Sequence, residues 1–504
     1  MSSFWLETNS QNLDFPALNS DIVVDTCIIG AGLFGLNTGY YLSNSGIKVA
    51  ILERENNIGT KTSGNSTAKL TSQHSLFYSH LIKDYGIDFG KKYLNANEEA
   101  ISNIKKIIDI HNIDCDFEWQ DSFVYTTNVD EDIKIQDEVD AVNILGLNAE
   151  FVTKTSLPFE ISSAIKFPNQ AQFHVSKFMN GLASCILNNN GKIFVDSGVE
   201  NIAKDADGYN VFTSNNKVHC KNVVMASHYP FLNIPGFYFS KMYQSTSYAI
   251  AVDTHTDLFD GMYISSPEPI FSFRTALYNG KKILIVGGNN HKTGEAIENN
   301  FNYSSLENKI FGLYPSSEIL FRWNTEDCIS LDKIPYIGKY SNIMPNIYIG
   351  TGFKKWGMST SNVAANIVTD MILGRKNEYS EVFSSTRLRP IKNRWEMKNM
   401  VKQTANSLVF NKYKIPSNSI SNIGLGNAEI ISIKGQNVGV YKSPTGEVFA
   451  VKPNCSHLGC LLAWNNLDKT WDCPCHGSRF DYKGNNLYSP ANKGLDTIEI
   501  NNLE

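Results

Sequence analysis

The sequence predicts an α/β nucleotide-binding domain with an interleaved α+β domain, followed by a small all-β domain. Two observations carry this prediction. A glycine-rich turn stands between a strand pattern and a helix pattern at residues 23–53, and two short loops rich in cysteine and histidine stand at residues 455–478. The chain has 504 residues, enough for two or three domains, and its 42% hydrophobic content is typical of a globular protein.

The first element is an apolar run at residues 23–29, which fits a buried strand. The sequence GAGLFG follows at residues 30–35, then a helical pattern through Leu42, then a second apolar run at residues 48–52 that ends in Glu53. A G-x-G-x-x-G turn between strand and helix, with an acid 23 residues after its first glycine, predicts a dinucleotide site.

Each residue of this fingerprint has a physical role. Gly30 permits the tight turn, Gly32 lets the backbone approach the pyrophosphate, and Gly35 allows close helix packing. The helix N-terminus attracts the phosphates, and Glu53 accepts hydrogen bonds from the ribose. The fingerprint alone fits both FAD and NAD. Its place at the start of a long domain, without a second comparable turn, favours FAD.

Three further stretches resemble the D-amino-acid oxidase and glycine oxidase superfamily of FAD enzymes, over roughly residues 20–375. They are GTKTSGNSTAK at 59–69, VVMAS at 223–227 and IYIGTGFKKWGM at 347–358, and PYIG at 335–338 is also similar. The resemblance implies that the first stretch wraps the pyrophosphate and that the third passes the flavin. Further cofactor-binding residues on this basis are Thr60, Ser66, Thr67, Val199, Gly352 and Gly357.

In that superfamily the substrate gives hydride directly to flavin, and protein groups mainly orient an amine and its carboxylate. Lys69 matches a basic position near the flavin ring, and Arg274 and Arg322 are candidates to clamp a carboxylate. A surface ion pair is the competing interpretation for each arginine. Residues 326–332 look inserted relative to the superfamily, so an amino acid, a simple amine and a methylated amine all stay open as substrates.

Aromatic and histidine side chains near these stretches have two interpretations. Tyr248, Tyr263 and Trp356 are candidates to wall the substrate pocket, or else they are packed aromatic residues. His74 and His174 are expected to be structural rather than catalytic.

Near the C-terminal end, Cys455, His457, Cys473 and His476 form the pattern C-x-H-x15-C-x-x-H. In a Rieske [2Fe–2S] site two thiolates hold one iron and two imidazoles hold the other. The reduction potential then lies at roughly −150 to +300 mV, against about −400 mV for an all-cysteine plant-type cluster. Zinc also binds two cysteines and two histidines, but zinc fingers place the two cysteines first. The pattern therefore favours a Rieske cluster and one-electron transfer.

The flanking sequences CSHLGC and CPCHGS resemble the Rieske proteins of respiratory and photosynthetic cytochrome complexes. The resemblance implies that the motif's cysteines bind one iron and its histidines the other. It also implies a disulfide between Cys460 and Cys475 and a hydrogen bond from Ser478 to a cluster sulfur. Phe480 stands where that family often has a tyrosine donor, so we expect a lower potential than in the cytochrome complexes.

The composition and charge of the chain argue against several classes of binding partner. The formal charge is −5, without a basic patch for nucleic acid, and no apolar stretch reaches the ~18 residues of a membrane span. The first 20 residues contain Glu7 and Asp14 and lack the apolar segment of a secretory signal. Five further cysteines are scattered singly, as in reduced cytosolic proteins. We expect a cytoplasmic protein that binds no nucleic acid and has no transmembrane segment.

We expect an FAD-dependent oxidoreductase at residues 1–385, a linker helix at 386–419 and a Rieske domain at 420–504. Together they predict a dehydrogenase in which an amine or amino acid reduces FAD and the cluster takes the electrons singly. An external acceptor, a protein or a quinone, then receives them. Two alternatives stay open: an electron-transfer flavo-iron-sulfur protein without amine turnover, and a redox sensor.

Overall fold

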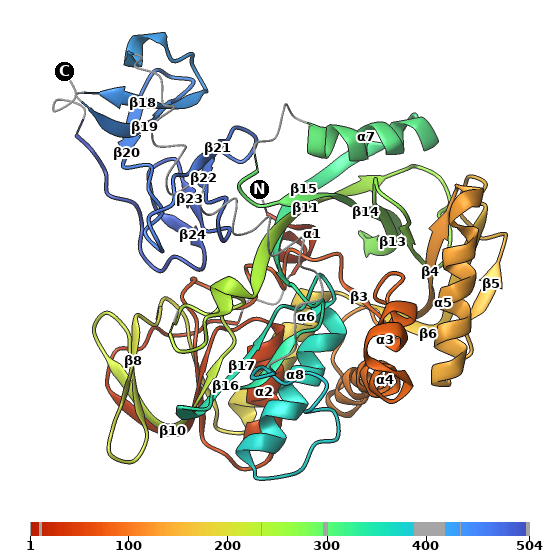
Figure 1. Cartoon of the computed structure of the whole chain (residues 1–504), viewed down its shortest axis with the longest axis horizontal. Helices are drawn as coiled ribbons and strands as arrows, with labels where there is room; N and C mark the ends of the chain where they lie inside the picture. The colour runs from red at the N-terminus through yellow and green to blue at the C-terminus, as the bar shows by residue number, and fades with distance from the viewer. Residues whose placement is uncertain are drawn as a thin grey trace.

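A computed structural model describes residues 2–9, 13–232, 234–295, 301–387, 419–433 and 435–499. These residues form two large mixed sheets with their helices and, at one end of the molecule, two small antiparallel sheets (Figure 1). The expected linker helix at 386–419 lies outside the described residues except at its two ends. None of the described helices is both long and apolar enough to cross a membrane.

The first large sheet has the strand order β16-β17-β10-β1-β2-β7, with the hairpin β8–β9 attached to β10. The five strands from β17 to β7 run parallel, and β16 is antiparallel to β17. β2 is buried throughout, as in a parallel sheet covered on both faces. The strands are β1 (Ile22–Ile29), β2 (Val49–Leu52), β7 (Lys192–Phe194), β8 (Asn201–Lys204), β9 (Tyr209–Phe212), β10 (Lys217–Met225), β16 (Tyr336–Ser341) and β17 (Met344–Thr351).

The second large sheet has the order β15-β11-β14-β13-β12-β4-β6-β3, with β5 paired to β6. Most of its neighbours are antiparallel, and β12 is parallel to β4. Its strands are β3 (Lys69–Leu70), β4 (Glu118–Thr126), β5 (Glu150–Val152), β6 (Ser163–Gln172), β11 (Met242–Asp253), β12 (Met262–Ser265), β13 (Phe271–Tyr278), β14 (Lys281–Lys292) and β15 (Glu318–Ser330).

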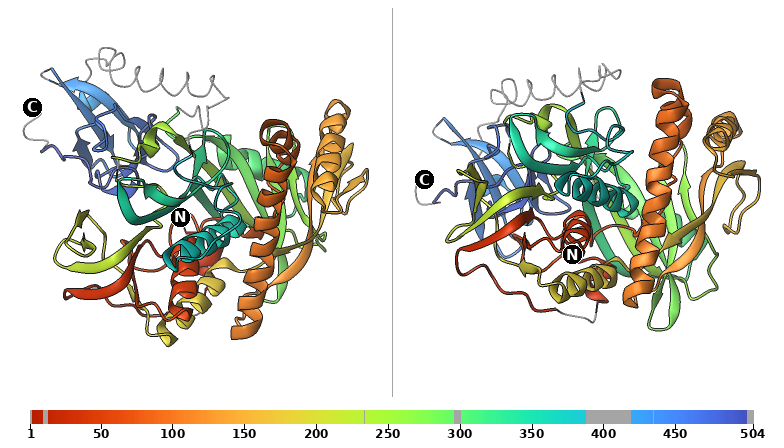
Figure 2. Two further views of the ribbon diagram at one scale, coloured as in Figure 1. Left: turned by 60° about the horizontal axis from the view of Figure 1, so that its bottom comes forward. Right: turned by 90° about the horizontal axis from the view of Figure 1, so that it is seen from below.

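Eight helices accompany the two sheets in the described residues. α2 packs against both α6 and α8, while α4 lies between α8 on one side and α5 on the other (Figure 2). α7 packs on β14 and β11. The helices are α1 (Phe4–Glu7), α2 (Leu33–Asn44), α3 (Tyr78–Tyr85), α4 (Ile87–His111), α5 (Asp132–Leu145), α6 (Val175–Asn188), α7 (Phe301–Leu313) and α8 (Gly357–Ile372).

The two large sheets are interleaved along the chain. The first takes its strands from three separate segments, and the second takes its strands from the chain between them. The runs expected at 23–29 and 48–52 form β1 and β2, and the stretch at 347–358 forms the end of β17, a turn and the start of α8. The predicted fold class is confirmed for these parts.

The C-terminal part is all-β in the described residues. One sheet holds β18 (Ala428–Ile433), β19 (Gln436–Lys442) and β20 (Val448–Val451), and the other holds β21 (Ala463–Asn465), β22 (Thr470–Asp472), β23 (Arg479–Asp481) and β24 (Asn486–Tyr488). Trp471 and Phe480 are fully buried in its core. In Figure 1, β24 lies on the side that faces the large sheets, while β18 lies on the outer side.

Candidate functional site

A cavity of about 330 Å³ lies at the carboxyl ends of β1, β10 and β17, where open α/β sheets bind their ligands. Nearly all of the expected cofactor residues line it. They are Gly30, Gly32, Glu53, Thr60, Ser66, Thr67, Val199, Gly352 and Gly357.

The glycine-rich turn has the close contacts that the fingerprint requires. Gly30 has φ of +105°, and a Cβ there would lie 2.6 Å from the carbonyl oxygen of Ala226. Gly35 does not line the cavity: a Cβ on it would lie 1.9 Å from the carbonyl oxygen of Gly30, so it sets the contact between α2 and the turn. Glu53 accepts a hydrogen bond from the amide of Ala31 at 2.7 Å, which orients its carboxylate at the end of β2.

The lining residues fit FAD. The Oγ1 of Thr60 is buried and has no hydrogen-bond partner among the described residues, so it is available to a ligand in the cavity. The amide of Leu33 donates to Ser63 Oγ at 3.0 Å, which holds the loop at 59–69 against the start of α2. A backbone open to close approach, a free hydroxyl and an oriented acid are the groups that a dinucleotide uses.

Lys69 also lines this cavity. Its Nζ donates to the carbonyl of Tyr263 at 3.0 Å and to the hydroxyl of Ser272. Burial, with Arg274 nearby, lowers the pKa of Lys69 to about 7. The ammonium group therefore loses its proton near neutral pH.

The structure contradicts the proposed role of Arg274. Its side chain is buried and donates to the backbone carbonyls of Ala68, Phe173 and Thr275 at 2.6, 3.2 and 2.9 Å. Its guanidinium also lies 4.9 Å from the ring of Trp5. Arg274 does not line the cavity, and its donors hold the backbone beside Lys69 together instead of facing a substrate.

Arg322 is also misplaced for a substrate clamp. It projects from β15 with 41% of its side chain exposed, and its Nε donates to Glu307 at 2.6 Å. This is the surface ion pair that the sequence left open as the alternative.

The aromatic and histidine candidates divide between the cavity and the core. Tyr248 and Trp356 line the cavity, whereas Tyr263 is buried and stacks on Phe123 of the neighbouring strand β4. His74 is buried beneath Trp356, with ring centroids 5.0 Å apart, and His174 caps α6. Both histidines have the structural positions expected of them.

Two charged residues in the cavity were missed by sequence reasoning. Asp327 on β15 is half-buried and lines the cavity, and burial raises its pKa to about 6. Lys355 donates to Ser247 Oγ at 2.8 Å from the turn before α8. Asp327 lies in the stretch 326–332 that looked inserted, and Lys355 lies in the stretch 347–358 that resembles a flavin-contacting segment. The sequence therefore contained a signal for each of these two residues.

The four candidate cluster ligands lie together in two neighbouring loops. The thiol of Cys473 stabilises a thiolate at Cys455 and lowers its pKa to about 7. The rings of His457 and His476 lie 5.1 Å apart, and burial lowers their pKa values to about 4 and 3, so both imidazoles are neutral. The Nδ1 of His476 is buried without a partner among the described residues. Two thiols and two neutral imidazoles fit a Rieske [2Fe–2S] cluster.

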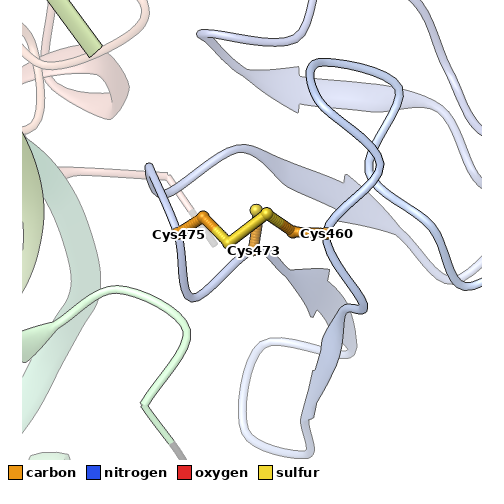
Figure 3. A group of neighbouring side chains, drawn as sticks. All are labelled: Cys460, Cys473 and Cys475. Carbon is orange, nitrogen blue, oxygen red and sulfur yellow. A yellow bond between two sulfur atoms is a disulfide. The ribbon is translucent and has the colours of Figure 1, made fainter. Parts of the chain in front are cut away.

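A disulfide joins Cys460 to Cys475 and ties the two loops together, as Figure 3 shows. The sulfur of Cys473 lies within 4.8 Å of both disulfide sulfurs. Since disulfide sulfurs are not thiolates, these three residues are not a second metal site. Ser478 lies beside Cys455 and helps to lower its pKa, and Phe480 is fully buried without a hydroxyl to donate.

The cluster loops pack directly on β11, a strand that lines the cofactor cavity. Gln244 of β11 donates from Nε2 to the carbonyls of His476 at 2.9 Å and Ser489 at 2.6 Å. A Cβ on Gly477 would lie 2.5 Å from the Cβ of Gln244. The ring of Phe239 lies 5.8 Å from that of His476. These contacts place the cluster loop against β11.

A buried charge cluster fixes the same interface. Arg479 of β23 donates to Glu326 of β15 at 2.7 Å, with the two side chains 2% and 0% exposed. It also pairs with Asp468 at 2.6 Å and Asp472 at 3.0 Å. The carbonyl of Glu326 accepts a hydrogen bond from Thr62 of the cofactor loop at 3.0 Å. One arginine thus connects the C-terminal domain to the loop that lines the cofactor cavity.

Comparisons with known proteins agree with both sites. Residues 25–371 match the family model described as FAD dependent oxidoreductase, and residues 415–499 match the Rieske [2Fe-2S] domain. The protein YhfW of Bacillus subtilis (strain 168) is 33% identical over 498 residues, covering 99% of this chain and 97% of YhfW.

Two other similar proteins cover the first part of the chain. Gamma-glutamylputrescine oxidoreductase of Escherichia coli (strain K12) is 21% identical over 395 residues, covering 74% of this chain and 89% of that protein. The structure of glycine oxidase from Geobacillus kaustophilus has a TM-score of 0.62 at 17% identity, covering 73% of this chain and 100% of that one. The second likeness is one of fold.

Proposed function

Since the chain belongs to the FAD-dependent oxidoreductase family and carries a Rieske [2Fe-2S] domain, we propose that it is a dehydrogenase of amines or amino acids. In this proposal the electrons leave singly through the chain's own iron-sulfur centre to an external acceptor, a protein or a quinone. Bound FAD supplies a two-electron acceptor for hydride, and the cluster supplies a one-electron acceptor. The names of glycine oxidase and gamma-glutamylputrescine oxidoreductase, both similar to this chain, support an amine or amino acid as substrate.

One observation supports the electron route: a single short segment of chain lies near both sites. His228 lines the cofactor cavity, and Tyr229 beside it is buried. Burial and the neighbouring thiols of Cys328 and Cys473 raise the pKa of Tyr229, so it lies close to a cavity residue and to a cluster ligand at once. A segment that lies near both sites supports electron transfer inside the chain.

The cavity also supports binding of a cationic amine. Asp327, Thr325 and Ser247 lie on one wall, because Ser247 and Thr325 are directly opposite each other on β11 and β15. We assign Asp327 the role of binding the substrate's ammonium group and accepting its proton, which leaves the unprotonated amine that hydride transfer requires. Lys355, on the same wall through Ser247, is the candidate partner for a substrate carboxylate.

The test is to add candidate amines and amino acids anaerobically to the oxidised, full-length protein. Absorbance follows the flavin, and low-temperature EPR follows the cluster. We expect bleaching of the flavin together with a growing Rieske-type signal. Bleaching without that signal would contradict the electron route. No bleaching across a broad panel, with both centres reduced by a reduced carrier protein, would replace the amine proposal by electron transfer alone.

A further inference from the structure

The C-terminal domain contributes side chains to the cofactor cavity itself. Tyr488 and Ser489, which end and follow β24, line the same cavity as Gly30, Gly32 and Glu53. The cavity is therefore not completed by the α/β domain alone. Its remaining wall comes from a domain more than 400 residues further along the chain.

The contacts lie where the fingerprint places the ribose and the pyrophosphate. Arg54 directly follows the acid Glu53, and it donates to Asn486 Oδ1 at 2.8 Å and to the carbonyl of Leu487 at 3.2 Å. One stretch of β24 thus binds the residue next to the ribose acid.

The loop at 59–69 is covered by the same strand. The Nζ of Lys61 lies 5.2 Å from the centre of the Tyr488 ring, a cation–π contact. The Arg479 guanidinium lies on the same ring at 6.0 Å, so Tyr488 stands between the cofactor loop and the buried charge cluster. Thr60, whose free hydroxyl faces the cavity, is next to Lys61.

We infer that the Rieske domain is part of the FAD site: Tyr488 and the backbone of β24 close the end of the cavity that receives the ribose and pyrophosphate. FAD in that position is enclosed by both domains. Binding of FAD and docking of the Rieske domain must then stabilise each other, because coupling between two binding equilibria is reciprocal. This role is separate from electron transfer and does not depend on the substrate.

The first experiment measures FAD affinity in the full-length protein. FAD is removed and titrated back, and binding is followed by the quenching of FAD fluorescence. Loss of the Tyr488 ring in Tyr488→Ala should raise the Kd for FAD about tenfold, because the bound cofactor would lose the aromatic surface that covers it. Asn486→Ala, which removes one acceptor of Arg54, should raise it by a smaller factor.

The matched control is Tyr482→Ala in the same domain. Tyr482 packs on Tyr441 and Phe449 and does not line the cavity, so the Kd should be unchanged. EPR of the cluster in each variant checks that the Rieske domain is folded. A Kd for Tyr488→Ala within twofold of the parent protein, with an intact cluster, would overturn the inference.

A second measurement needs no substitution and stays decisive if Tyr488→Ala does not fold. Hydrogen exchange at residues 486–492 is compared in the FAD-free and FAD-loaded full-length protein. We expect slower exchange there when FAD is bound, while exchange in β18 on the outer side is unchanged. Equal exchange at 486–492 in the two states would refute the coupling.

Discussion

At the residue scale, two neighbouring acidic residues on β15 face different parts of the protein. Glu326 points to Arg479 in the Rieske domain, and Asp327 points into the cofactor cavity. Successive side chains of a strand point to opposite faces, so one dipeptide can serve both a domain interface and a cavity. The identity of each acid is plain in the sequence, but which face it occupies depends on the pairing of β15 with β11.

Asp327→Asn tests the role of this carboxylate in binding substrate. Asp327 has a pKa of about 6, with Lys355 and Glu326 as its charged neighbours, so it is ionised above that pH. In the parent protein, kcat/KM for a cationic amine should rise with pH through about 6. In Asp327→Asn this limb should disappear and KM should rise roughly tenfold to a hundredfold, the value of a hydrogen bond to a charged group.

Steady-state kinetics across pH 5–8, with an artificial acceptor, measures both effects. Asp260→Asn is the matched control, because Asp260 is 76% exposed and pairs only with Lys282 on the surface in the described residues. An unchanged pH limb in Asp327→Asn would exclude this carboxylate from substrate binding.

At the element scale, the position of α2 decides whether the glycine-rich turn can form. A Cβ on Gly35 would collide with the carbonyl of Gly30, which is backbone and cannot rotate away. The atoms nearest to a Cβ on Gly39 of the same helix would be side-chain carbons of Ile51 and Ile186. The two glycines thus have different reasons to be small.

Gly35→Ala should therefore separate the helix from the turn. We expect a loss of roughly 1–3 kcal/mol in the free energy of unfolding, the usual cost of overpacking, together with weaker FAD binding. Gly39→Ala should cost less, because flexible side chains can move and alanine favours the helix by about 1 kcal/mol over glycine. Thermal unfolding with and without FAD compares the two, and equal losses would contradict this account.

The local pattern was sufficient to predict these elements. The strand–glycine turn–helix unit and the two ligand loops are recognisable because their residues are close in sequence and each has a fixed geometric role. Arg274 and Arg322 were wrongly proposed because an arginine on a strand gives no local sign of which partner it meets. In the fold, Arg274 donates to backbone carbonyls, and Arg322 pairs with a surface glutamate.

At the scale of the whole molecule, the FAD cavity, the cluster loops and the buried charges form one connected region. Gln244 joins the strand wall to the cluster loop, and Arg479 joins the Rieske domain to β15. A cluster held in this way has a fixed place beside the cofactor cavity. The proposed electron route requires that fixed place.

Glu326→Gln tests the interface as a whole. Removing the charge of Glu326 weakens the ion pair that holds Arg479. Removal of one partner of a buried ion pair typically lowers the free energy of unfolding by about 3–5 kcal/mol. We expect cluster reduction after flavin reduction to slow by about tenfold or more, with flavin reduction itself little changed. Anaerobic stopped-flow absorbance, with EPR to confirm cluster content, measures the two steps separately.

Glu307→Gln is the control for that experiment. Glu307 of α7 pairs with Arg322 of β15 at the protein surface, and such partly exposed pairs contribute little to stability. Its kinetics should match the parent protein. If Glu326→Gln reduced its cluster as fast as Glu307→Gln, the buried charge would not govern transfer between the centres.

The sequence by itself determined the two cofactors and most residues that line their sites, because fingerprint and ligand motifs are local and each residue type has one chemical use. Only the tertiary structure decided which residues from distant parts of the chain lie together at the two sites. The wall that Tyr488 adds to the cavity, the Glu326–Arg479 pair and the inward side of Asp327 each depend on strands far apart in sequence. Their meeting is set by packing of whole sheets and domains, which no local pattern encodes.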